Sequence, residues 1–220
     1  MRSELASDAR PLGLRRWTLL LLGIAVVLAD LSFFTTGQAA HSPWRIAMGA
    51  GALLVAFLLS GRRGSAVGLR AVPQPSLRFW IRVVVILAVG SILLLAAGAA
   101  WFWYRGEPLP AGQFRGPADV WPAFTKSVLL APVSEELVYR AVLCLPLRVV
   151  LGPWLAIMIS GAAFAYLHVA YGNFAPNHVF AGLVMSWAYV RSGCLWLPIL
   201  LHALGNLQVF LLNLTPWSWA

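Results

Sequence analysis

Charged residues are scarce in this chain of 220 residues. Only 10% of them are charged, 60% are hydrophobic, and Lys126 is the only lysine. A soluble domain contains about 25% charged and about 45–50% apolar residues. This composition argues strongly against a soluble globular enzyme, and it excludes a disordered chain or a coiled coil.

Cysteine is almost absent. The two cysteines, Cys144 and Cys194, both lie in apolar stretches. So few cysteines exclude a disulfide scaffold, and neither lies in a redox motif or a zinc knuckle. We expect both side chains to contribute to packing rather than to a disulfide.

Acidic residues are also few, with 7 Asp and Glu against 16 Lys and Arg, which gives a net charge of +9. In a soluble protein this excess would suggest nucleic acid as a partner. Here the arginines cluster between apolar blocks, without a basic stripe interleaved with exposed aromatics, so we expect no nucleic-acid partner. The positive-inside rule accounts for the clusters and places the N-terminus and the loop 62–78 in the cytoplasm.

Long apolar blocks dominate the sequence. They cover about residues 17–34, 44–59, 79–104, 121–150, 154–171, 177–190 and 195–214. At about 20 residues for each crossing, they predict an all-α polytopic transmembrane bundle of about seven spans, or eight if Pro132 splits the fourth block. The first block is interpreted as an uncleaved signal anchor, and the segment 105–119 as an extramembrane loop. The expected location is the bacterial cytoplasmic (inner) membrane.

Some ionisable residues lie inside the apolar blocks. A charge near the bilayer centre costs about 2.5–3.5 kcal/mol on insertion scales, so such residues indicate function by default. Glu135 and Glu136 are adjacent, and Arg140 follows Glu136 at the i, i+4 spacing that allows a pair on one helix face. Asp30 and His178 lie nearer the ends of their blocks and are interpreted as non-catalytic, although His178 is a candidate for lining an entry path.

Two later blocks carry further polar side chains. Phe164 and His168 share one helix face, and so do His202 and Asn206. The small residues at 160–163 permit close helix contact in lipid. Together the three blocks supply carboxylates, imidazoles, an arginine and an amide, which are sufficient for water activation and oxyanion stabilisation.

The order E-E-x-x-x-R, F-x-x-x-H, H-x-x-x-N resembles the CPBP family, which includes type II CAAX prenyl proteases and the bacteriocin-processing Abi proteins. The resemblance covers a catalytic core at about 120–215, whereas residues 1–110 form N-terminal transmembrane helices without a recognised motif. Many family members have Phe and Gly beside the motif arginine, where this chain has Tyr139 and Ala141.

The resemblance implies an intramembrane endopeptidase. Glu135 and His168 would position and activate water, His202 and Asn206 would donate hydrogen bonds to the oxyanion, and Glu136 with Arg140 would support the site electrostatically. A metal-free mechanism is favoured, since no H-E-x-x-H motif is present. The alternative is a zinc enzyme, for which Glu135, His168 and His202 are the candidate ligands.

The expected partners are the lipid bilayer and the tail of a peptide or protein substrate. Three kinds of tail are candidates: that of a prenylated CAAX protein, a bacteriocin leader and the sorting tail of a surface protein. The oligomeric state stays open. Two other hypotheses are a catalytically silent scaffold or immunity factor and a proton-coupled transporter that uses Glu135 and His168 as a relay.

Overall fold

A computed structural model describes residues 15–35, 43–107, 117–170, 172–173 and 175–214. The described residues form helices and no strands. In chain order the helices are α2 (Arg15–Thr35), α3 (Pro43–Leu59), the short 3₁₀ turn η2 (Gly64–Val67), α4 (Leu77–Arg105), α5 (Pro117–Ala123), η3 (Phe124–Leu130), α6 (Ala131–Glu136), η4 (Leu137–Cys144), α7 (Leu145–Leu151), α8 (Pro153–Ala170), α9 (Pro176–Ser192) and α10 (Trp196–Leu214). The all-α prediction is confirmed.

Segments α5 to α7 follow one another without a break and form one long rod, so Pro132 does not split the fourth block. The described residues therefore contain seven long helical rods, which agrees with the approximate count of seven to eight spans. Four of them, α2, α4, α8 and α10, are long and apolar enough to cross a membrane, and α3 is a shorter apolar helix. The chain is thus a helical membrane protein. Residues 1–14 and 108–116, on which part of the orientation and loop predictions rest, lie outside the described residues.

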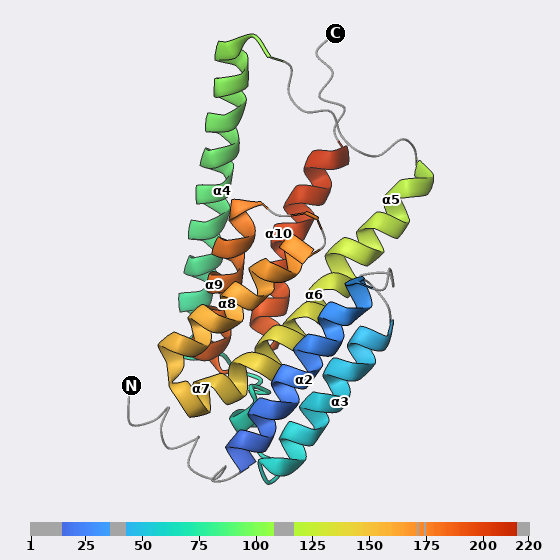
Figure 1. The fold of residues 1–220 in the computed structure, drawn as a ribbon. Helices are drawn as coiled ribbons and strands as arrows, with labels where there is room; N and C mark the ends of the chain where they lie inside the picture. The colour runs from blue at the N-terminus through green and yellow to red at the C-terminus, as the bar shows by residue number, and fades with distance from the viewer. Residues whose placement is uncertain (1–14, 36–42, 108–116, 171, 174, 215–220) are drawn as a thin grey trace.

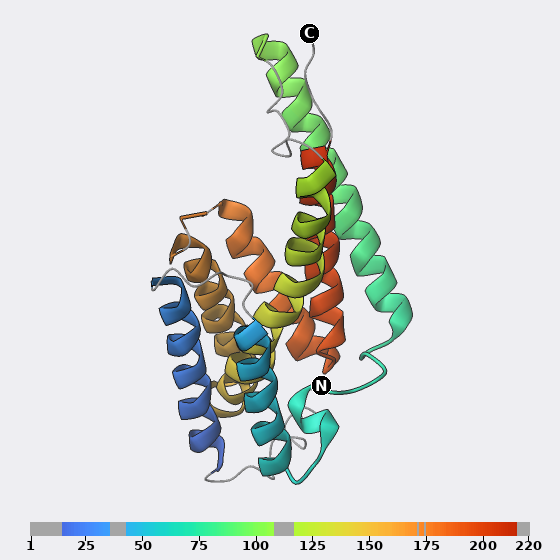
Figure 2. The same cartoon turned by 90° about the vertical axis from the view of Figure 1, so that its right-hand side faces the viewer.

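The α5–α7 rod runs obliquely through the bundle and organises the other helices around it (Figure 1). Helices α2 and α3 pack side by side against η4, and α8 and α9 form a tightly packed pair. Helix α10 lies along η3 and α6. Helix α4 stands at the periphery (Figure 2), and none of its most apolar stretch is buried within the protein. Its exposed apolar side chains are those expected to contact lipid.

Two stretches of the rod are π-helical, and each ends just before a proline. Segment η3 precedes Pro132, and η4 precedes Pro146. A proline lacks the amide hydrogen and clashes with the carbonyl four residues earlier. A wider π turn absorbs this mismatch: the amide of Ala131 donates to the carbonyl of Lys126, five residues back. The rod therefore stays continuous. The wider turn changes the direction in which the following side chains project from the rod, and η4 carries Tyr139 and Arg140.

Glycines allow the helices to approach closely, as the small residues at 160–163 predicted. A Cβ atom on Gly182 of α9 would lie 2.5 Å from the carbonyl oxygen of Gly161 in α8. A Cβ atom on Gly49 of α3 would lie 2.9 Å from Cβ of Leu137. Close backbone contact is the main source of helix association where lipid removes the hydrophobic drive. These contacts hold α9 against α8, and α3 against the α5–α7 rod.

Candidate active site

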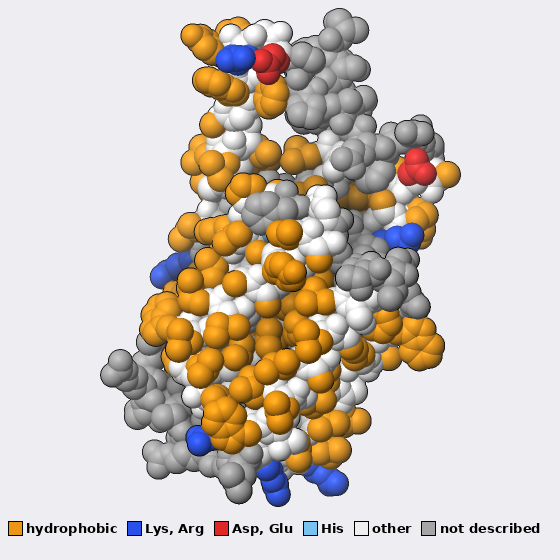
Figure 3. Space-filling model, in the orientation of Figure 1, with side chains coloured by type: hydrophobic (Ala, Val, Ile, Leu, Met, Phe, Trp, Pro, Cys, Tyr) orange, Lys and Arg blue, Asp and Glu red, His pale blue; other side chains and the backbone are white. Residues whose placement is uncertain are grey.

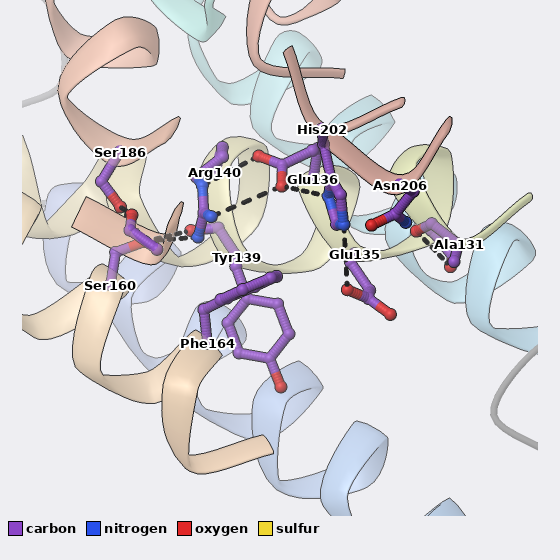
Figure 4. Close-up of polar contacts among 12 residues, drawn as sticks. Ala131, Glu135, Glu136, Tyr139, Arg140, Ser160, Phe164, Ser186, His202 and Asn206 are labelled. Atoms are coloured by element: carbon purple, nitrogen blue, oxygen red, sulfur yellow. Dashed lines mark hydrogen bonds and ion pairs between the residues drawn. The ribbon is translucent and has the colours of Figure 1, made fainter. Parts of the chain in front are cut away.

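Glu136 lies at the end of α6 and is completely buried. Its Oε2 atom lies 2.8 Å from Nε of Arg140 in an ion pair, and its Oε1 atom accepts a hydrogen bond from Nη2 of Arg140 at 3.4 Å. The same Oε1 atom lies 2.9 Å from Nδ1 of His202 in α10 (Figure 4). The predicted pairing of Glu136 with Arg140 is confirmed, and the carboxylate also joins α10 to the rod.

Arg140 is held on a second side by α8. Its guanidinium lies 4.9 Å from the ring centroid of Phe164, and its Nη1 donates to the hydroxyl of Ser160 at 3.4 Å. The Ser160 hydroxyl in turn donates to the carbonyl of Tyr139 at 2.7 Å and accepts from Ser186 at 3.2 Å. A buried charge needs this kind of enclosure. The network fixes the position of the guanidinium and therefore that of Glu136.

Glu135 faces a different set of groups. Its Oε2 atom lies 3.8 Å from Nε2 of His202, and its Oε1 atom lies 3.9 Å from Nη1 of Arg45 in α3. The side chain is buried, and its Oε2 atom has no hydrogen-bond partner among the residues that the structure describes. A buried carboxylate oxygen without a partner is costly. Such an oxygen has the character of a group that bonds a reactant.

A second buried ion pair lies beside Glu135. Asp30 of α2 accepts two hydrogen bonds from Arg45, at 2.5 Å to Nε and 2.9 Å to Nη2, and a third from the Tyr139 hydroxyl at 3.2 Å. Asp30 and Arg45 are both completely buried. Asp30 does lie near the end of its helix, as predicted, but this part of α2 packs against η4, so the carboxylate is buried and paired with Arg45.

Sequence reasoning missed Arg45. A signal was present: each of the first two apolar blocks carries one internal charge, and the two charges are opposite. If consecutive blocks form a hairpin, such charges can meet at the same depth and pair. Only the register of α2 against α3 shows that they do.

Phe164 links the histidines. Its ring centroid lies 4.7 Å from that of His168 and 5.5 Å from that of His202. The ring of His168 stays close to the backbone of α8, and its Nδ1 atom lies 3.0 Å from the carbonyl oxygen of Phe164. His168 also stacks on His178 of α9 with ring centroids 3.9 Å apart. His178 of α9 thus adjoins the site through His168, and its role in lining an entry path stays a prediction.

Asn206 lies on the same face of α10 as His202, one turn further on, as predicted (Figure 4). Its Nδ2 atom donates to the carbonyl of Ser127 in η3 at 2.7 Å. The amide therefore bridges α10 and the rod in this conformation. A role toward an oxyanion requires this bond to be exchanged for one to a substrate.

Other candidate chemistry was also predicted or excluded from sequence. The hydroxyls of Ser134, Ser160 and Ser186 each donate to a backbone carbonyl. Cys144 and Cys194 are buried free thiols. Among the described residues, no three His, Cys, Asp or Glu side chains converge as metal ligands, so Glu135, His168 and His202 do not form a zinc site in this arrangement.

The structure thus gathers all six predicted site residues around one region. Glu135, Glu136, His202 and Arg140 are in direct contact, His168 joins them through Phe164, and Asn206 lies one helical turn away. Their catalytic roles remain predictions.

The comparisons with known proteins agree with this location. Residues 117–208 match the family model described as type II CAAX prenyl endopeptidase Rce1-like. No curated protein and no solved structure matches the chain. The matched segment contains the α5–α7 rod, α8, α9 and most of α10, and so all six predicted site residues. In residues 117–208 the chain therefore carries a domain of the Rce1-like family of type II CAAX prenyl endopeptidases, which are CPBP intramembrane proteases.

Proposed function

We propose that this protein is an intramembrane endopeptidase in which Glu135 activates the attacking water. The observation that carries the proposal is the buried Oε2 atom of Glu135, which finds no hydrogen-bond partner in the described part of the chain and lies 3.8 Å from Nε2 of His202. A carboxylate placed in this way can accept a proton from water held against a substrate carbonyl.

In the proposed reaction the water oxygen attacks the carbonyl carbon while Glu135 takes one proton from the water. The electrons of the carbonyl π bond move to the oxygen, which becomes an oxyanion. The oxyanion then reforms the carbonyl as the C–N bond breaks, and protonated Glu135 returns its proton to the leaving amine. No covalent intermediate with the enzyme is required, which suits a site whose serines are all bonded to backbone carbonyls.

The histidines supply two different hydrogen bonds. Nδ1 of His168 faces the Phe164 carbonyl, which can only accept, so the proton lies on Nδ1 and Nε2 is the acceptor nitrogen. We assign His168 to holding the water through Nε2. Nδ1 of His202 faces the carboxylate of Glu136, so its Nε2 donates only when the ring is an imidazolium. We therefore assign a protonated His202 to the oxyanion, together with Asn206 released from Ser127.

The substrate class we propose is the extended tail of a membrane-associated or lipid-modified peptide or protein. A buried site on lipid-embedded helices can accept a backbone only if the chain is unfolded, which favours termini. The lipid-facing helices and the family place the protein in a membrane.

We further propose the bacterial cytoplasmic membrane with the N-terminus in the cytoplasm. Nη1 of Arg15 donates to the carbonyl of Leu59, and the amide of Arg70 donates to the carbonyl of Gly193, which joins the start of α2 and the ends of α3 and α9 at one end of the bundle. Figure 3 shows several basic side chains at the lower end of the visible face and, among the described residues, no acidic ones there. A basic end is expected to face the cytoplasm.

The test is cleavage of end-labelled tail peptides by the purified protein in proteoliposomes, with prenylated and unmodified peptides compared. Glu135→Gln should lower kcat by about 100- to 10,000-fold, the range for a lost general base. The matched control is Glu107→Gln, which alters an exposed glutamate paired with Arg105 and should leave kcat unchanged. Undiminished cleavage by Glu135→Gln would overturn the proposal.

The other hypotheses predict different results. A silent scaffold or immunity factor would keep its cellular function in the Glu135→Gln form. A transporter would show substrate uptake that depends on a proton gradient, with no peptide product.

A further inference from the structure

We propose that Arg45, supplied by the N-terminal helix α3, is the positioning residue for Glu135. The inference rests on the proposed function, since it concerns the glutamate assigned as the general base. Arg45 lies outside the segment 117–208 that matches the family. The N-terminal helices therefore complete the site rather than only anchor it.

The geometry of the guanidinium supports this role. Nε and Nη2 of Arg45 are both taken by the carboxylate of Asp30, which fixes the plane of the group. Nη1 of the same guanidinium lies 3.9 Å from Oε1 of Glu135 in an ion pair. One oxygen of Glu135 is thereby held toward a cation, and the other, Oε2, is turned toward His202.

Asp30 is itself fixed from the α5–α7 rod. The hydroxyl of Tyr139 donates to its Oδ2 atom at 3.2 Å, and the Tyr139 ring lies edge-on to Phe164 with centroids 5.9 Å apart. Both ends of Tyr139 are therefore tied to the site, because its carbonyl accepts from Ser160. Each of the two adjacent glutamates has its own guanidinium: Arg140 for Glu136 and Arg45 for Glu135.

The helix packing brings Arg45 within reach. Gly49 lies one turn after Arg45 on α3, and a Cβ atom there would be 2.9 Å from Cβ of Leu137. Leu137 follows the two glutamates directly in the rod. The close contact at Gly49 therefore sets the distance at which Arg45 faces Glu135.

A simpler role for Arg45 is an ion pair that only joins α2 to α3. Such a role needs opposite charges at 30 and 45, in either order, and needs no cation beside Glu135. The two roles therefore differ in their response to exchanging the charges. Asp30→Arg combined with Arg45→Asp keeps an ion pair between the helices but places a carboxylate next to Glu135.

The experiment measures kcat and KM for tail cleavage in proteoliposomes for Arg45→Lys, Arg45→Gln and the exchanged double variant. We expect Arg45→Gln to lower kcat by about 100-fold with KM within about twofold, the loss typical of a misplaced catalytic group. Arg45→Lys should retain more activity than Arg45→Gln because it keeps the charge. The exchanged variant should match the wild-type melting temperature more closely than Arg45→Gln does, yet have kcat at least as low.

Arg105→Gln is the matched control, because it removes an exposed arginine paired with Glu107 and should leave kcat unchanged. Wild-type kcat in the exchanged variant would show that the ion pair only joins helices. Unchanged kcat in Arg45→Gln would also overturn the inference, while leaving the proposed function intact.

A second measurement does not depend on cleavage. Melting temperatures of Arg45→Gln, Glu135→Gln and the double variant form a cycle, and a direct contact should make the shift of the double variant differ from the sum of the single shifts by roughly 2–10 °C. If the melting temperatures show coupling between Arg45 and Glu135 but the wild-type protein cleaves no tail peptide, the proposed function is wrong while the contact between the two residues stands. Additive shifts would defeat the positioning role.

Discussion

Glu136→Gln is the substitution for which the structure predicts the largest combined loss of stability and activity. The carboxylate is completely buried and contacts Nε and Nη2 of Arg140 at 2.8 and 3.4 Å and Nδ1 of His202 at 2.9 Å. Glutamine has nearly the same volume, so packing is preserved. The substitution removes the negative charge and replaces one acceptor oxygen with an NH2 donor, which leaves the buried guanidinium of Arg140 without its counterion.

The magnitude follows from these contacts. Removing one partner of a buried ion pair costs about 3–5 kcal/mol, because the other charge remains buried and uncompensated. For a chain of 150–250 residues each kcal/mol shifts the melting temperature by about 2–4 °C. We therefore expect the melting temperature to fall by roughly 6–20 °C. The catalytic rate should fall as well, because Nδ1 of His202 loses its anionic acceptor, which holds Nε2 toward Glu135.

The assay is thermal unfolding of the detergent-purified protein, followed by size-exclusion recovery, alongside cleavage in proteoliposomes. The informative second variant is Glu136→Gln with Arg140→Met, which removes both charges and keeps similar volumes. Its melting temperature should recover most of the loss, since no unpaired charge remains, while its activity stays low. A shift below about 2 °C for Glu136→Gln alone, or a double variant less stable than that single one, would refute the reasoning.

Three further predictions follow from the packing and the polar contacts. Gly182→Ala should destabilise the protein by about 1–3 kcal/mol in thermal unfolding, because the new Cβ atom would meet the backbone of α8. Gly51→Ala, where a Cβ atom meets open space, should leave the stability unchanged. Equal effects of the two substitutions would contradict the close contact at Gly182. Asn206→Ala should lower kcat by about 100-fold, as expected for a lost oxyanion donor. Asn213→Ala removes an exposed hydrogen bond within the same helix and should leave kcat unchanged. Equal kcat values for the two variants would remove Asn206 from the site. Extensive dialysis against a chelator should leave cleavage unchanged, and a loss restored by zinc would show that the donors converge in the working enzyme.

Much of the fold was predictable because lipid imposes a simple rule on the sequence. Every backbone polar group in the bilayer must be satisfied within its own helix, so each long apolar block becomes a helix with boundaries near those of the block. The pairs Glu136 with Arg140 and Phe164 with His168 were predictable for a similar reason. Their partners are four residues apart, and helical geometry places them on one face without reference to other helices.

The two π-helical stretches were not predicted. Pro132 was visible in the sequence, but a proline in an apolar block can break, kink or widen a helix. The rod remains continuous because neighbouring helices enclose it: α2 and α3 pack on η4, and α10 packs on η3. Their packing, rather than the proline itself, favours the wider turn over a break.

The sequence by itself determined that the chain is a helical membrane protein and which of its polar side chains belong together on each helix. Both depend on local rules, namely the length of apolar blocks and the helical repeat. Only the tertiary structure decided that Arg45 and Asp30 join Glu135 and that Asn206 bonds Ser127. These contacts cross between helices, so they depend on how far one helix slides and rotates against the next, and side-chain packing over the whole bundle sets that register.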